Sequence, residues 1–170
     1  MTGARAGRRR VVGAAVVCGM LMMGVSGCAL PSADQGPTFS QQARDNEDLD
    51  KAQKHFLRGE FGLAEKHYRR TIESEPNNYE AWLGLAAAYD QLSRYDLADR
   101  SYGRAKALKG ETAILLNNMG YSRMLRGDLA RARRLLVRAQ QKDPYDERIV
   151  SNIRELNTKL TKIGRRPIEL

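Results

Sequence analysis

The chain has 170 residues and a formal net charge of +9; 42% of its residues are hydrophobic and 29% are charged, which excludes a wholly disordered chain. Aromatic residues make up only 6%, while Ala, Leu, Arg and Glu are abundant, so the composition favours helices over a β-sandwich or barrel. Two cysteines are too few for a framework of several disulfide bonds.

The first thirty residues have the pattern of an export signal. Arginines at positions 5, 8, 9 and 10 precede an uncharged stretch over residues 11–30, which contains Val25-Ser26-Gly27-Cys28. This motif resembles the lipobox of bacterial lipoproteins. The resemblance implies that residues 1–27 are a lipoprotein signal peptide and that Cys28 is acylated. A plain transmembrane anchor, or a signal cut elsewhere, would also export the C-terminal part.

The residues after the cysteine bear on location and charge. Ala29 indicates sorting to the periplasmic face of the outer membrane, with the inner membrane as the alternative. Removal of residues 1–27 takes away four arginines and no acids, so the net charge falls from +9 to +5. Residues 28–44 are rich in Pro, Ser, Gly and Gln and show no apolar period, so we expect a flexible linker.

From about residue 45 the chain repeats with a period of 34 residues. Pro76 and Pro144 lie two periods apart, and Gly110 lies midway. On this period small, turn and aromatic residues recur at matching positions: Ala52, Ala86 and Gly120; Gly59, Ser93 and Gly127; Ala64, Ala98 and Ala132; Tyr68 and Tyr102; Ala105 and Ala139. The middle unit adds Trp82, Leu85 and Tyr89, and the whole pattern resembles the tetratricopeptide-repeat (TPR) family.

The resemblance implies an all-α fold: a TPR solenoid of three helix-turn-helix repeats followed by a C-terminal capping helix. We expect a TPR domain over residues 45–163, with repeats near 45–78, 79–112 and 113–146 and a tail over 164–170. The capping helix is expected over 146–162, because its apolar residues form one helical stripe. The other helices are expected near 45–58, 61–74, 79–92, 95–108, 113–126 and 129–142.

No catalytic, metal-binding or cofactor-binding cluster is recognisable in the sequence. The only histidines, His55 and His67, fall on different expected helices, and no free cysteine of the mature chain would join them. We interpret His55 as a packing substitute for tyrosine and His67 as a surface residue. There is no Gly-rich phosphate loop and no recognisable pair of nucleophile and base. We therefore expect a non-enzymatic protein that needs no cofactor.

In TPR proteins a partner segment binds a concave groove lined by the first helix of each repeat. The family's groove positions, carried onto this chain, are Leu49, Gln53, Phe56, Leu83, Ala87, Asp90, Asn117, Asn118, Tyr121 and Met124, with Leu57, Glu80, Gln91, Ile114 and Leu125 beside them. Apolar clusters at both ends and acids between them suit an amphipathic helix or extended peptide with a basic or amide-rich centre. The Lys and Arg clamp of chaperone-tail TPR domains is absent, which disfavours that ligand class.

Two features of the third repeat have two interpretations each. The amides of Asn117 and Asn118 either bind the backbone of a ligand or pack locally. Arg131, Arg134 and Arg138 form a basic stripe, which either contacts anionic lipid or an acidic partner or is a solvated convex face. Nucleic acid is disfavoured for an exported domain without a stacking platform.

Three stretches carry a more specific resemblance. Residues 116–122, 125–129 and 149–157, together with the signal, lipobox, spacer and repeats, resemble the TPR lipoproteins of the Tad (Flp-type) tight-adherence pilus machinery. This resemblance implies a lipid-anchored scaffold whose groove holds a secretin or another pilus-assembly component. One alternative is a general periplasmic TPR adaptor for envelope biogenesis. The other is a TPR accessory to an enzyme, or an unrecognised enzyme itself.

Overall fold

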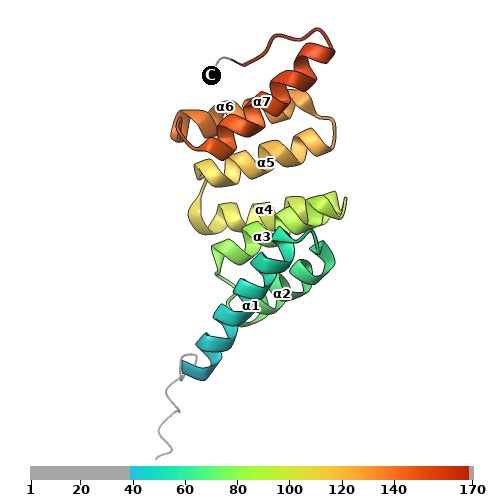
Figure 1. Ribbon diagram of the computed structural model, residues 1–170. Helices are drawn as coiled ribbons and strands as arrows, with labels where there is room; N and C mark the ends of the chain where they lie inside the picture. Colours follow the sequence, from blue (N-terminus) through green and yellow to red (C-terminus); the bar gives the residue numbers. More distant parts are fainter. Residues whose placement is uncertain (1–38, 169–170) are drawn as a thin grey trace, which may run out of the picture. The chain divides into compact units, whose positions relative to one another are not determined.

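The computed structural model of the protein describes residues 39–168 (Figure 1). These residues form seven α-helices and no strand: α1 (Phe39–Leu57), α2 (Phe61–Ser74), α3 (Tyr79–Gln91), α4 (Tyr95–Lys109), α5 (Ala113–Leu125), α6 (Leu129–Lys142) and α7 (Glu147–Lys162). The expected all-α architecture, three helix-turn-helix repeats followed by a capping helix, is confirmed. The expected signal peptide, the acylated Cys28 and linker residues 28–38 lie outside the described residues.

The start of α1 differs from the expectation. The helix begins at Phe39, six residues before the expected position 45, so residues 39–44 belong to α1 and not to the linker. The 34-residue pattern begins only after this point and could not indicate the extra turns. Gln and Ala are good helix formers, and no Gly or Pro interrupts the segment after Pro37.

Side-chain caps fix where several helices begin. The side chains of Asn78, Thr112 and Asp146 accept hydrogen bonds from backbone N–H groups in the first turns of α3, α5 and α7, at 2.9, 3.1 and 2.8 Å. Asp128 caps α6 in the same way, by accepting from the N–H of Arg131 at 3.0 Å. These contacts satisfy donors that a helix N-terminus leaves without an intrahelical partner.

The turn inside each repeat uses a left-handed residue at the expected position. Gly59, Ser93 and Gly127 have φ values of 76°, 58° and 75°. Glycine adopts this conformation without steric cost, whereas a serine at the same position is strained. The three turns join α1 to α2, α3 to α4 and α5 to α6.

Small residues lie where the two helices of a repeat approach each other. The recurring alanines of the pattern are fully buried: Ala52, Ala64, Ala86, Ala98, Ala105, Ala132 and Ala139. At Gly120 even a Cβ atom would lie only 2.7 Å from Cγ of the buried Leu136. One cluster of buried side chains extends from Ala52 to Leu115, and a second extends from Leu116 to Ile168.

The segment after α7 packs against the domain as far as residue 168, so it is not a free tail up to that point. Ile168 is buried, its N–H donates to Oδ1 of Asn157 at 2.6 Å, and Nδ2 of Asn157 donates to the carbonyl of Ile168 at 2.8 Å. Arg133 of α6 donates to the carbonyls of Arg166 and Pro167. The segment therefore packs on α7 and α6 and does not line the hollows described below.

No helix in residues 39–168 combines the length and the apolar character needed to cross a membrane.

Candidate functional site

Two adjoining hollows lie over the first helices of the repeats and α7. The larger, about 570 Å³, is lined by Phe56, Ala87, Gln91, Asn117, Asn118, Tyr121, Glu147, Arg148, Ser151 and Asn152. The smaller, about 330 Å³, is lined by Gln53, Phe56, Tyr68, Tyr79, Glu80, Leu83, Gly84, Ala87, Ile114, Asn118 and Arg148. Because four residues line both hollows, we treat them as one site and call it the groove.

The structure brings most of the predicted groove residues together. Gln53, Phe56, Leu83, Ala87, Asn117, Asn118 and Tyr121 line the groove, as do the neighbouring Glu80, Gln91 and Ile114. They come from α1, α3 and α5, the first helix of each repeat. That these residues bind a partner stays a prediction.

Five predicted groove positions lie elsewhere. Asp90 and Met124 are buried with 3% and 4% of their surface exposed, so the prediction that they line the groove is wrong. Leu49 packs against the first core cluster. Leu57 and Leu125 are exposed and line neither hollow.

Asp90 is instead the centre of a buried polar network that joins three helices. The hydroxyl groups of Tyr102 and Ser122 donate to its two carboxylate oxygens at 2.8 and 2.7 Å. A nitrogen of the Arg126 guanidinium lies 3.5 Å from the Asp90 carboxylate. Burial raises the pKa of Asp90, although these hydrogen bonds and the Arg126 charge favour its ionised form.

Arg126 extends this network to Asp99 of α4. Its two terminal nitrogens donate to the two Asp99 oxygens at 2.8 and 2.7 Å, and Arg123 also donates to Asp99. The guanidinium carbon lies 4.7 Å from the ring centre of Tyr95. We call Asp90, Asp99, Tyr102, Ser122, Arg123 and Arg126 the buried network; it holds α3, α4 and α5 together, and it removes Asp90 from the expected acidic centre of the groove.

The two asparagines of α5 have different environments. Oδ1 of Asn117 accepts a hydrogen bond from Nδ2 of Asn152 at 2.8 Å, and Nδ2 of Asn117 donates to Asn118 at 3.4 Å. Asn117 is also buried, with 5% of its surface exposed. Local packing is therefore the better interpretation for Asn117, whereas Asn118 is partly exposed in both hollows.

Sequence reasoning missed the contribution of α7 to the groove. Arg148, Ser151 and Asn152 line it from a helix that we expected only to cap the repeats. The signal was present, because α3, α5 and α7 begin at Tyr79, Ala113 and Glu147, at constant intervals of 34 residues. Helix α7 is thus the first helix of a fourth, half repeat, and it places the Arg148 cation at the edge of the groove.

The two histidines meet between α1 and α2. Their rings stack with centres 5.3 Å apart, Nδ1 of His67 lies 2.6 Å from Asp48, and Nδ1 of His55 lies 2.5 Å from Glu60. The interpretation of His67 as a surface residue is wrong, because its side chain is only 13% exposed. Among the described residues, no group of three or more His, Cys, Asp or Glu side chains could hold a metal ion.

The basic stripe of α6 is partly neutralised. Arg131 lies 3.2 Å from Asp128, and Arg138 forms an ion pair with Glu111. These exposed pairs favour the interpretation of the stripe as a solvated face.

Comparison with known proteins identifies the repeat. Residues 67–100 match the family model described as "Tetratricopeptide repeat". The fold is that of a TPR domain. Protein bimA of Emericella nidulans is 30% identical over 57 residues, which are 34% of this chain and only 7% of that protein.

Solved TPR structures align with most of this chain. The first TPR domain of human RPAP3 covers 71% of this chain and 94% of its own, with 20% identity and a TM-score of 0.62. The second TPR domain of human RPAP3, solved with the HSP70 peptide SGPTIEEVD, covers 68% and 96%, with 20% identity and a TM-score of 0.58. Pseudomonas aeruginosa pilF covers 73% of this chain and 57% of its own, with 23% identity and a TM-score of 0.61. At these identities the likeness establishes the fold.

Proposed function

We propose that this protein is a lipid-anchored TPR scaffold that holds a segment of a protein partner in its groove as an accessory of Tad/Flp pilus assembly. The observation that carries the proposal is the groove itself. Five helices contribute to it, and it combines apolar side chains such as Phe56, Leu83 and Tyr121 with the amide of Asn118. An apolar lining with a few polar groups suits a peptide or an amphipathic helix.

The burial of Asp90 changes the expected chemistry of the partner. Without that carboxylate, the charges at the groove are Glu80, Glu147 and Arg148. Glu80 is paired with Lys109 at 2.8 Å, and Arg148 is paired with Asp146 at 2.6 Å. The groove therefore suits a partner segment with apolar side chains, whose backbone hydrogen-bonds to amide groups such as that of Asn118, better than it suits a basic segment.

Two comparisons support this proposal at the level of fold. The RPAP3 domain with its bound HSP70 peptide is a TPR structure that binds a protein segment. Pseudomonas aeruginosa pilF is a structural neighbour, in line with the resemblance of residues 116–122 and 149–157 to TPR lipoproteins of the pilus machinery. The outer-membrane secretin, or another pilus-assembly component, is the partner we propose.

The groove is tested by replacing partly exposed side chains that do not belong to the buried network. Tyr121→Ala with Asn118→Ala should reduce the recovery of pilus-assembly components in a crosslinking pull-down from membranes and should reduce pili, with the helical circular-dichroism signal unchanged. Arg131→Ala with Arg134→Ala, on α6 outside the groove, is the matched control. Unaltered recovery and normal pili would overturn the groove as the binding site. Recovery of another envelope protein in place of pilus-assembly components would overturn the Tad role and indicate the general adaptor.

The anchor is tested at Cys28. Cys28→Ser should release the protein from the membrane or misplace it, because acyl chains supply about 0.8 kcal/mol of membrane affinity per buried methylene. Fractionation of cells measures this directly. A protein that stays in the membrane fraction after this change would indicate a plain transmembrane anchor.

A further inference from the structure

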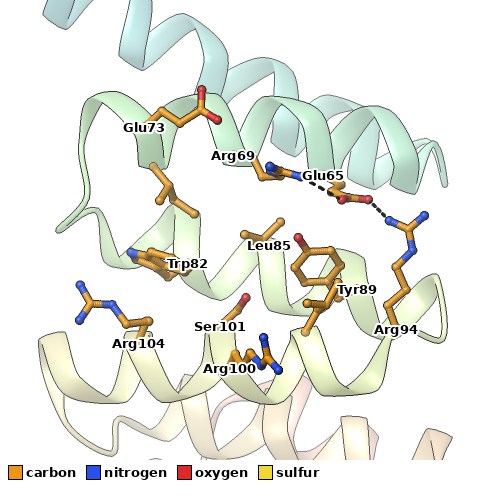
Figure 2. Close-up of a pocket in the computed structure, with 12 residues that line it drawn as sticks. Glu65, Arg69, Glu73, Trp82, Leu85, Tyr89, Arg94, Arg100, Ser101 and Arg104 are labelled. Atoms are coloured by element: carbon orange, nitrogen blue, oxygen red, sulfur yellow. Dashed lines mark hydrogen bonds and ion pairs between the residues drawn. The ribbon is translucent and has the colours of Figure 1, made fainter.

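A hollow of about 660 Å³ lies between α2 and α4, with α3 at its base, and shares no residue with the groove (Figure 2). We call it the α2–α4 hollow. Leu85 and Tyr89 of α3 are buried at its base, and the partly exposed Ile72, Trp82 and Leu97 line its sides. Helices α2 and α4 both pack on α3, and among the described elements they do not pack on each other. Between them the apolar side chains of Ile72, Trp82 and Leu97 stay partly open to solvent above the buried base.

Trp82 is a fixed apolar platform in this hollow. Its Nε1–H donates to the carbonyl of Pro76 at 2.8 Å, so its polar atom is satisfied and its ring is held in place. The guanidinium carbon of Arg104 lies 5.7 Å from the ring centre. Large rigid aromatic side chains with a neighbouring arginine are the residues that most often dominate protein interfaces.

The edge of the hollow is basic. Four arginines line it, Arg69, Arg94, Arg100 and Arg104, against two glutamates, Glu65 and Glu73. Glu65 is paired with both Arg94, at 2.6 Å, and Arg69, at 3.9 Å, as the dashed lines in Figure 2 show. Within the described residues no acidic group lies at ion-pair distance from Arg100 or Arg104, which are exposed one helical turn apart on α4.

We propose that the α2–α4 hollow is a second docking site, which takes an acidic segment of a protein partner. An apolar or aromatic side chain of that segment packs on the accessible parts of Trp82, Ile72 and Leu97, above the buried Leu85 and Tyr89, and flanking carboxylates pair with Arg100 and Arg104. The positive charge of the edge favours a negatively charged partner. The apolar side chains of the hollow favour a peptide segment with apolar residues over a surface that carries charge alone. The site lies on different residues from the groove, so the two can be occupied at once.

The single tryptophan of the chain allows a direct test. The full chain, purified in detergent, is titrated with the synthetic peptide Ac-DEEFLEED-amide, labelled at one end for anisotropy. We expect saturable binding that shifts the Trp82 emission to shorter wavelength, because the ring loses water, and that weakens as salt is added. The peptide Ac-NQQFLQQN-amide, with amides in place of the acids, should bind several-fold more weakly.

Variants locate the binding. Arg100→Ala with Arg104→Ala should weaken peptide binding by about three- to tenfold, which is the range expected for two exposed charge pairs. Arg131→Ala with Arg134→Ala removes the same charge from α6 and should leave it unchanged. The groove variant Tyr121→Ala with Asn118→Ala should also leave it unchanged, which separates this proposal from the proposed function.

Three results would overturn the second docking site. The first is no saturable change of Trp82 emission with the acidic peptide. The second is equal loss of binding in the α4 and α6 arginine variants, which would indicate a general charge effect. The third is a Trp82 shift with phosphatidylglycerol vesicles but not with the peptide, which would identify the occupant as a membrane surface.

Discussion

At the scale of single residues, the buried carboxylate of Asp90 holds helices next to the groove in position. Its carboxylate accepts hydrogen bonds from Tyr102 on α4 and Ser122 on α5, while its own backbone belongs to α3. A buried carboxylate is costly unless hydrogen bonds and a countercharge compensate it. Here two hydroxyl groups and Arg126 do so, and α3 and α5, which both line the groove, are held in register with α4.

Removing this carboxylate should destabilise the protein strongly. We expect Asp90→Ala to lower the free energy of unfolding by about 2–4 kcal/mol, because it leaves two buried hydroxyl groups without their carboxylate acceptor and takes one of two carboxylates away from Arg126. Asp96→Ala, on the exposed side of α4, should cost less than about 1 kcal/mol. Chemical denaturation monitored by circular dichroism measures both, and equal effects would refute the role of the buried network.

The pH dependence of stability should report on Asp99. Partial burial alone would raise the pKa of Asp99, but the hydrogen bonds and charges of Arg126 and Arg123 outweigh burial and hold this pKa below its usual value. A carboxyl group with a lowered pKa stabilises the fold above its unfolded pKa of about 4, and this contribution is lost as pH falls through the folded pKa.

Asp99→Asn should therefore lower the free energy of unfolding at neutral pH, and its difference from the wild type should shrink below about pH 4. The raised pKa of Asp90 acts in the opposite direction, so the difference between variant and wild type is the readout and not the wild-type curve alone. Urea unfolding over a pH series measures it, with Asp96→Asn as the control. A difference that stays constant down to about pH 2 would contradict the ion-pair account.

At the scale of the helices, close approach within a repeat depends on the absence of a side chain. Gly120 of α5 faces Cγ and Cδ2 of Leu136 on α6, at 2.7 and 3.0 Å from the position of a Cβ atom. Gly84 of α3 meets the ring of Tyr68 on α2 similarly, across the boundary between the first and second repeats. Gly103 of α4, in contrast, faces open space.

The same substitution, Gly to Ala, should therefore change the stability in opposite directions at Gly120 and Gly103. Gly120→Ala should destabilise the protein by about 1–3 kcal/mol, because overpacking against the fully buried Leu136 outweighs the gain in helix propensity. Gly103→Ala should stabilise it by about 0.5–1 kcal/mol through propensity alone. Thermal and denaturant unfolding measure both values, and a stabilised Gly120→Ala protein would show that the helices can separate without cost.

The helices themselves were predictable from the sequence, because the residues that mark their boundaries recur in three repeats at intervals of 34 residues. Small residues such as Ala64 and Ala98, and turn residues such as Gly59, mark the same structural position in successive repeats. The start of α1 at Phe39 was not predictable in this way, since the residues before position 45 do not belong to the period. The same holds for Ile168, which packs on α7 through hydrogen bonds to Asn157.

The groove was predictable only in part. A groove position taken from the family pattern predicts which face of a helix a residue lies on, but not which residues surround it. The pattern therefore identified Phe56, Ala87 and Tyr121 correctly and misplaced Asp90. The partners of Asp90 lie 12 and 32 residues away, and no local pattern marks their convergence. The contribution of α7 could have been found by extending the period to Glu147.

At the scale of the whole molecule, the groove depends on both core clusters. Ala87 and Gln91 lie on α3 in the first part of the domain, and Ser151 and Asn152 lie on α7 in the last. The buried network connects these parts across α4 and α5, so the groove keeps its lining only while the repeats stay together. The proposed anchor at Cys28 would keep this groove close to a membrane.

Site-specific photo-crosslinking in cells that assemble pili tests most directly whether the groove holds a partner. A photoreactive amino acid at position 118, in the groove, should give a crosslink to one pilus-assembly component, and the same group at position 131, on α6, should not. No product from position 118, or the same products from both positions, would contradict the claim that the groove holds a partner segment.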